Sequence, residues 1–269
     1  MGYTQTGRMK KRMLLACALL WAGASASAPR PLTPAPETGR FSMSSYIGKQ
    51  PLLAWCDAPR RVLALLQYGI PAENAQATPP NGELYEWPKT AAGTGKIQVS
   101  KVQIGAPDSG AGQIYTPLKL TSGPRKGQSG YVHTSNIENT SDPSYRMTKT
   151  GEFKLGNGVY KCRYVKDAAF IGVTRKRTVI IWDNGKTATY ATRNFDGSAG
   201  VYVTGGKNID FGSETGWGYE FLKKEGYKYS VSSGDGMRPK QPPLSVTVYR
   251  KGKVLTDEPF LAYSISLPK

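Results

Sequence analysis

From Leu84 onward, short apolar or β-branched runs alternate with clusters of Gly, Asn, Asp and Pro. Runs of this length and spacing predict β-strands separated by turns. In chain order, the predicted strands cover 84–87, 97–104, 113–120, 130–137, 151–155, 159–165, 168–174, 178–182, 187–193, 201–204, 219–222, 227–231, 244–250 and 260–266. Regular short strands with frequent turns indicate a sandwich or barrel, so we expect a mainly β protein.

One segment, from Asp57 to Leu66, departs from this pattern of strands and turns and predicts a short helix. Asp57 is a suitable N-cap, Pro59 fits the first turn, and the apolar run from Val62 to Leu66 ends before Gly69. We therefore expect a single helix of about ten residues at this point.

A polar segment around 139–147 separates two series of predicted strands. We place a domain boundary there, with a first domain over 51–145 that contains the short helix. The second domain, over 146–269, is expected to be a larger antiparallel β-barrel or sandwich. Hairpin-type turns at 156–158, 183–185 and 251–252 support the assignment of its strands.

The N-terminal segment has the pattern of a secretory signal peptide. A basic cluster at 10–12 precedes an apolar run and small residues in A-x-A form, which predicts removal of residues 1–26. Cleavage after Ala28 and a start at Met9 instead of Met1 remain alternatives. Residues 27–50 are rich in Pro and predict an extended tether. We expect a periplasmic or secreted protein that retains no transmembrane segment after cleavage.

The chain is basic, with a formal net charge of +17. The predicted signal peptide carries four of its cations and no anion, and residues 149–269 hold 20 cations against 11 anions, a net charge of +9. This charge predicts an anionic partner such as peptidoglycan or another envelope polymer. Export argues against nucleic acid as that partner.

Cysteine and histidine are scarce, with three Cys and one His in the chain. A zinc ribbon or a His-rich metal site needs more ligands than this, and we expect no metal and no cofactor. Without Cys17 in the signal peptide, Cys56 and Cys162 form an even pair, which predicts a disulfide in an oxidising compartment.

Residues 127–138, preceded by 112–120, resemble the closing strands of bacterial SH3-like domains, in which a Gly-rich turn leads into Gly-Trp/Tyr-Val-x-x-Ser. The resemblance covers about 84–138 and implies a small barrel with a surface for cell-wall peptide or glycan. Tyr115, Tyr131 and His133 are the binding residues that it suggests. An unrelated β-hairpin is the alternative.

Residues 150–266 resemble the periplasmic inhibitors of c-type lysozyme through Tyr160-Lys161-Cys162, the turn at 183–189 and the loop at 197–202. The resemblance implies that Ser198 enters the lysozyme cleft while Tyr202 supports its loop. The sequence at 211–218 departs from the family pattern, and a domain of +9 would repel a cationic lysozyme. A plain hairpin loop is the alternative.

Two further sets of residues are candidates for function. Arg175, Lys176 and Arg177 fall between two predicted strands and form a basic turn suited to anionic polymers. Cys56 and His133 follow the chain order of cell-wall cysteine peptidases, although a disulfide would remove that nucleophile. We expect a noncatalytic binding protein of the cell envelope, with a glycosidase inhibitor and a cysteine hydrolase as alternatives.

Overall fold

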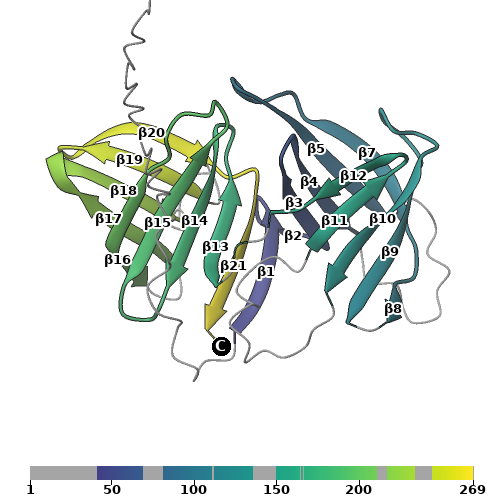
Figure 1. Cartoon of the computed structure of the whole chain (residues 1–269), viewed down its shortest axis with the longest axis horizontal. Helices are drawn as coiled ribbons and strands as arrows, with labels where there is room; N and C mark the ends of the chain where they lie inside the picture. Colours follow the sequence, from purple (N-terminus) through teal and green to yellow (C-terminus); the bar gives the residue numbers. More distant parts are fainter. Residues whose placement is uncertain are drawn as a thin grey trace, which may run out of the picture. The chain divides into compact units, whose positions relative to one another are not determined.

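The computed structural model describes residues 41–68, 81–110, 112–135, 150–163, 165, 167–210, 217–233 and 244–268. Within these ranges most residues lie in β-strands, and the one helical element is the 3₁₀ turn η2 (Lys224–Gly226). The strands form two antiparallel sheets (Figure 1). The prediction of a mainly β protein is confirmed.

The first sheet has ten strands and curls into a barrel-like form. Eight of them follow the order β12-β11-β10-β9-β7-β5-β4-β3, while β6 pairs with β5 and β8 with β9. Their bounds are β3 (Ala54–Ala58), β4 (Arg61–Gln67), β5 (Gly82–Thr90), β6 (Gly93–Thr94), β7 (Gln98–Ile104), β8 (Asp108–Gly110), β9 (Gln113–Leu120), β10 (Ser129–Ser135), β11 (Thr150–Leu155) and β12 (Gly158–Lys161).

A disulfide and a backbone hydrogen bond bring the two end strands of the first sheet together. Cys56 in β3 is bonded to Cys162, directly after β12. The next residue, Arg163, donates its backbone N–H to the carbonyl oxygen of Asp57 at 3.1 Å. The disulfide prediction is confirmed, and it closes the sheet on itself.

The core of the first sheet is mainly aliphatic. Strand β9 shows how it forms, because its residues alternate between exposed and buried positions and the buried ones face inward. The buried cluster comprises Ala54, Cys56, Ala58, Leu63, Leu65, Leu84, Val102, Ile104, Leu118, Leu120, Val132, Phe153 and Leu155. Each fully buried leucine contributes about 1.5–3 kcal/mol relative to an exposed one.

The second sheet has eleven strands in the order β2-β1-β21-β13-β14-β15-β16-β17-β18-β19-β20. Their bounds are β1 (Phe41–Ile47), β2 (Gln50–Pro51), β13 (Ala168–Val173), β14 (Arg177–Asp183), β15 (Ala188–Asn194), β16 (Tyr202–Asp210), β17 (Trp217–Lys223), β18 (Tyr227–Ser232), β19 (Ser245–Arg250), β20 (Lys253–Pro259) and β21 (Ala262–Pro268). Strand β21 pairs with both β1 and β13, so it joins the earliest described strand to the remainder of the sheet.

Aromatic rings dominate the core of the second sheet. Its buried cluster includes Phe170, Tyr190, Tyr219, Phe221, Tyr229, Phe260 and Tyr263. The ring of Tyr190 lies 5.2 Å from that of Tyr229 and 5.3 Å from that of Phe221. Burial raises the pKa of the Tyr263 hydroxyl to about 12, because the apolar core disfavours the charged phenolate.

A third apolar cluster contains residues from both sheets. Trp55 and Val62 of the first sheet belong to it together with Ile171 of the second. The indole N–H of Trp55 donates to the hydroxyl of Ser264 at 2.6 Å. Strand β4 is therefore buried on both faces, since Leu63 faces the barrel core while Val62 faces the third cluster.

The double burial of β4 explains why the predicted helix is wrong. Asp57 lies within β3, and the run from Val62 to Leu66 is strand β4, with Pro59 at the turn between them. A continuous apolar run fits a strand with two buried faces as well as it fits a short helix, and local periodicity does not separate them.

The predicted tether is wrong for its last ten residues. Residues 41–50 pair as β1 and the start of β2, because β21 supplies a partner strand from the far end of the chain. The signal peptide and residues 27–40 lie outside the described residues.

The predicted domain boundary also falls outside the described residues and stays a prediction. In the described structure, the strands change from the first sheet to the second later in the chain, between β12 and β13.

The glycines of the predicted turns adopt positive φ as hairpin turns require, at 58° for Gly156 and 80° for Gly185. No helix in the described part of the chain is long and apolar enough to cross a membrane.

Candidate functional site

Three of the predicted binding residues lie together on the outer face of the first sheet. Tyr115 in β9 is the cross-strand partner of His133 in β10, and Tyr131 lies two residues before His133 on the same face. We call these three residues the aromatic strip. Their immediate neighbours Thr116 and Val132 are buried, which orients the strip outward.

The rings of the aromatic strip contact one another. His133 stacks on Tyr115 with ring centroids 4.7 Å apart, and Tyr131 meets Tyr115 edge to face at 5.2 Å. Tyr115 is 40% exposed. The strip therefore presents a preassembled aromatic surface to solvent.

Hydrogen bonds hold two members of the strip in place. The hydroxyl of Tyr131 donates to Glu152 Oε1 at 2.8 Å, and this bond to a carboxylate raises the pKa of Tyr131. Nε2 of His133 is hydrogen-bonded to Oε1 of Gln113. Residues on β9, β10 and β11 thus fix the orientation of the rings before any ligand binds.

Lysines flank the aromatic strip. Lys154 in β11 is the cross-strand partner of Tyr131 and places its ammonium 5.8 Å from the centre of that ring. Lys119 lies in β9 opposite Ser129, and Lys161 lies in β12 opposite Glu152. All three lysines are exposed, so three cations and the Glu152 carboxylate lie on the strands that carry and adjoin the rings.

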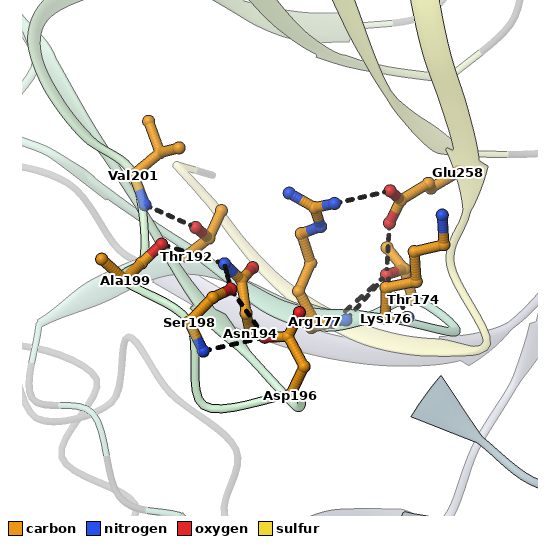
Figure 2. Close-up of polar contacts among 10 residues, drawn as sticks. All are labelled: Thr174, Lys176, Arg177, Thr192, Asn194, Asp196, Ser198, Ala199, Val201 and Glu258. Carbon is orange, nitrogen blue, oxygen red and sulfur yellow. Dashed lines mark hydrogen bonds and ion pairs between the residues drawn. The ribbon is translucent and has the colours of Figure 1, made fainter. Parts of the chain in front are cut away.

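The predicted basic turn joins β13 to β14, and its three cations differ in their surroundings. Arg177 is half-buried and forms an ion pair with Glu258 at 2.9 Å (Figure 2). The hydroxyl of Thr174 donates to the same carboxylate at 2.8 Å and accepts hydrogen bonds from the backbone N–H groups of Lys176 and Arg177. Arg175 and Lys176 remain exposed, whereas Arg177 serves to fix the turn.

Ser198 lies on the exposed loop between β15 and β16. Its hydroxyl donates to Asp196 Oδ1 at 2.6 Å and accepts a hydrogen bond from the amide of Asn194 at 3.0 Å (Figure 2). The bonds from Ser198 lower the pKa of the Asp196 carboxyl. Tyr202 begins β16 and is 37% exposed. The loop is therefore braced by its own polar side chains.

The basic turn and the Ser198 loop are neighbours. The backbone N–H of Phe195 donates to the carbonyl of Lys176 at 2.9 Å, and Arg177 is the cross-strand partner of Asn194. The predicted site residues therefore fall into two groups on different sheets, the aromatic strip on the first and the turn and loop on the second.

Cys56 is not available as a nucleophile in this state. Its sulfur is bonded to Cys162, it is 1% exposed, and it lies within a strand and not at the start of a helix. Only a free thiolate attacks a substrate. His133 belongs to the aromatic strip, where Gln113 is its hydrogen-bonding partner.

The predictions missed a buried ion cluster at one end of the first sheet. Glu86 is 1% exposed and accepts hydrogen bonds from Arg61 Nη1 at 2.7 Å and Arg125 Nε at 2.6 Å. Both guanidinium groups also lie over the ring of Tyr160, at 4.6 and 5.5 Å. A sequence signal existed, because Glu86 shares the period-two face of Leu84 and so occupies a core position.

Among the described residues, no group of three or more His, Cys, Asp or Glu side chains is arranged to hold a metal ion. Comparisons with models of protein families, with curated proteins and with solved structures find no match to the chain.

Proposed function

We propose that this chain is an exported, noncatalytic binding protein of the bacterial cell envelope that recognises an anionic glycan, with peptidoglycan as the first candidate. The observation that supports this function is the aromatic strip, in which three contacting rings are held at the surface between lysines. Clustered rings that are neither buried nor paired with a core are uncommon on a surface without a binding role.

The chemistry of the strip suits a charged sugar polymer. The flat faces of Tyr and His rings stack on the apolar faces of sugar rings, as aromatic side chains do with other flat partners. Lys119, Lys154 and Lys161 are positioned to attract carboxylate or phosphate groups on such a polymer. Because these lysines are exposed, their contribution should weaken as salt is added.

A sedimentation assay with purified, insoluble peptidoglycan tests this function. We expect the wild-type protein to be retained at low salt, and Tyr115→Ala to weaken retention about tenfold, the equivalent of about 1.4 kcal/mol. Tyr202→Ala is the matched control, because this tyrosine is similarly exposed but lies on the second sheet. Absence of wild-type retention at low salt, or an equal loss in both variants, would overturn the proposal.

The lysines provide a second, independent readout. Lys154→Ala should lower retention at low salt and flatten its dependence on salt, since one electrostatic contact is removed. Lys223→Ala, in β17 of the second sheet, removes an equally exposed cation and serves as the control. Identical salt curves for the two variants would show that charge near the strip plays no specific part.

Inhibition of a lysozyme-like glycosidase is a second candidate function. The exposed position of Ser198 on a loop braced by Asn194 and Asp196 favours it, because a preassembled loop loses little entropy on entering a cleft. A lysozyme activity assay should show inhibition by the wild-type protein and by Tyr115→Ala, and loss of inhibition in Ser198→Asp. Full lysozyme activity in the presence of excess wild-type protein would exclude this function.

A further inference from the structure

The buried carboxylate of Asp57 forms ion pairs with cationic side chains from separate parts of the chain. Asp57 in β3 is 3% exposed and forms ion pairs with Lys89 of β5 and, at 3.0 Å from Nε, with Arg163. The hydroxyl of Thr178 in β14 of the second sheet donates to its Oδ2 at 2.8 Å. Partners from three other segments, two near the first sheet and one in the second, therefore converge on one acidic side chain.

A third cation lies at the same place. Arg193 in β15 is the cross-strand partner of Thr178, so both side chains are on one face of the second sheet. Phe195, two residues further along, places its ring 4.7 Å from the ammonium of Lys89. Arg193 is thus adjacent to the Asp57 cluster, and its side chain is exposed to solvent.

The charges in this cluster do not balance. Among the described residues, Asp57 is the one carboxylate that forms ion pairs with Lys89 or Arg163, and Arg193 forms none there. Lys89, Arg163 and Arg193 carry three positive charges against the one negative charge of Asp57, so the cluster has two positive charges in excess. Of the two arginines, Arg163 is the one that is partly withdrawn from water, with its side chain 18% exposed. A nearby cation such as Arg193 adds to the cost of its charge, and an anion would relieve that cost.

The titration behaviour of the cluster agrees with this imbalance. Burial lowers the pKa of Arg163 against the attraction of Asp57, and repulsion from Arg193 adds to the lowering. Burial also lowers the pKa of Lys89, with Arg163 and Arg193 adding to the effect against the attraction of Asp57. Burial and mutual repulsion together therefore disfavour the charged forms of Lys89 and Arg163, in spite of the attraction of Asp57.

We infer that Arg163 and Arg193 form a binding site for a small oxyanion of the phosphate class. Arg163 uses Nε toward Asp57, so its two Nη groups are the atoms that would face such a ligand. Guanidinium groups bind the oxygens of phosphate through pairs of parallel N–H donors, which favours an oxyanion over chloride. This site is separate from the aromatic strip and does not depend on the proposed glycan binding.

Thermal unfolding in phosphate tests the site, because a ligand that binds only the folded protein raises Tm. At pH 7 and matched ionic strength, phosphate should raise the Tm of the wild-type protein more than sodium chloride does. Arg193→Ala should abolish most of this difference and weaken phosphate affinity in calorimetry about tenfold or more. Lys207→Ala, an exposed cation in β16, should behave as the wild type.

A charge reversal separates binding from simple destabilisation. Arg193→Glu supplies a carboxylate where the oxyanion is expected, so this variant should have a Tm at or above that of the wild type in chloride and no response to phosphate. A phosphate response that persists in both Arg193 variants would overturn the inference. So would the absence of any difference between phosphate and chloride in the wild-type protein.

The source of the anion is addressed by a second probe. Glycerol 3-phosphate carries the terminal phosphate monoester found on polymers and lipids, whereas inorganic phosphate is the free ion. A Tm response to both supports a site that accepts a phosphate borne by a larger molecule, and a response to inorganic phosphate alone supports a site for the free ion. Peptidoglycan retention by Arg193→Ala should equal that of the wild type, so failure of this site and failure of the proposed function can be distinguished.

Discussion

The cores of the two sheets differ in their aromatic content, although Trp55 and Trp87 of the first sheet are buried in the third cluster. The core of the first sheet contains one buried phenylalanine, Phe153, among aliphatic side chains, while Tyr115, Tyr131 and His133 lie on its outer face. The second sheet buries most of its rings, such as Tyr190 and Phe221, in its interior. Rings that could have filled a core are therefore displayed on the first sheet, which is the physical reason to regard them as a binding surface.

The same comparison extends to how each sheet is held together. The first sheet concentrates its strongest constraints where its end strands meet and at the Glu86 cluster. The second sheet is stabilised by many contacts between aromatic rings. Some of its buried tyrosines also form a hydrogen bond through the hydroxyl, as Tyr263 does by donating to the carbonyl oxygen of Gly48 at 3.1 Å. Loss of one constraint should therefore affect the two sheets differently.

Replacement of both cysteines, Cys56→Ser with Cys162→Ser, should have the largest effect. The sequence separation of 106 residues implies a loss of about 4–5 kcal/mol in the loop-entropy model. Hydrogen exchange should show that amides of β3 to β12 lose more protection than those of β14 to β19. Equal loss in both sheets would mean that they unfold as one cooperative unit.

Truncation of one buried aromatic ring should cause the second largest loss of stability. Phe221 is fully buried and packs against Gly206, where a Cβ would lie 2.1 Å from the ring. Phe221→Ala should lower the free energy of unfolding by about 3–4 kcal/mol through lost burial and a cavity. Urea denaturation measures this, with Leu222→Ala as the exposed neighbour that should change little. Similar values for the two would contradict the description of the aromatic core.

Neutralisation of Glu86 tests the end cluster of the first sheet. Glu86→Gln leaves Arg61 and Arg125 beside a neutral amide, and should cost about 2 kcal/mol because two charge-assisted hydrogen bonds are weakened. The arginines are partly exposed, which limits the penalty. Urea denaturation provides the value, and Glu220→Gln, from a half-exposed ion pair of the second sheet, should cost less.

Removal of the Ser198 hydroxyl should have the smallest effect, confined to its loop. The hydrogen bonds from Ser198 favour the charged form of Asp196, so their contribution is present above the ordinary pKa of 3.8 and is lost as pH falls through the lowered value. Ser198→Ala should raise the pKa of Asp196 toward 3.8, measured by carboxyl NMR titration. Ser109→Ala, an exposed serine in β8, should leave it unchanged, and an unaltered titration in Ser198→Ala would show that the loop is not braced as described.

Local sequence patterns predicted much of the fold. Strand β9 has the bounds that alternation predicts, and the disulfide followed from counting cysteines. The errors lie where a partner is remote in sequence: β4 was mistaken for a helix because its second buried face contacts the other sheet, and β1 was mistaken for tether because its partner is β21. Tertiary contacts decided both cases.

The candidate sites show the same difference between features set by local sequence and features set by contacts remote in sequence. The three residues of the aromatic strip were predicted as one set of binding residues, and pairing of β9 with β10 is what brings their rings into contact. Asp57 was interpreted as a helix N-cap, and its ion pairs carried no signal, because Lys89 lies in β5 and Arg163 follows β12, which no spacing in the sequence connects. Arg177 was predicted as a free turn cation, but the ion pair with Glu258 depends on the position of β20.

The position of β21 bears on the order in which the protein can be assembled during synthesis. All strands of the first sheet lie between β2 and β13 in the chain, so the first sheet is an insertion into the second. It can fold as soon as it emerges, whereas β1 must wait for β21, which is made after every other described strand. Until then β1 and β13 each keep an unpaired edge, the kind of edge on which incomplete chains associate with one another. Premature termination before Ala262 should therefore yield aggregates in which the inserted barrel is folded and its host sheet is not.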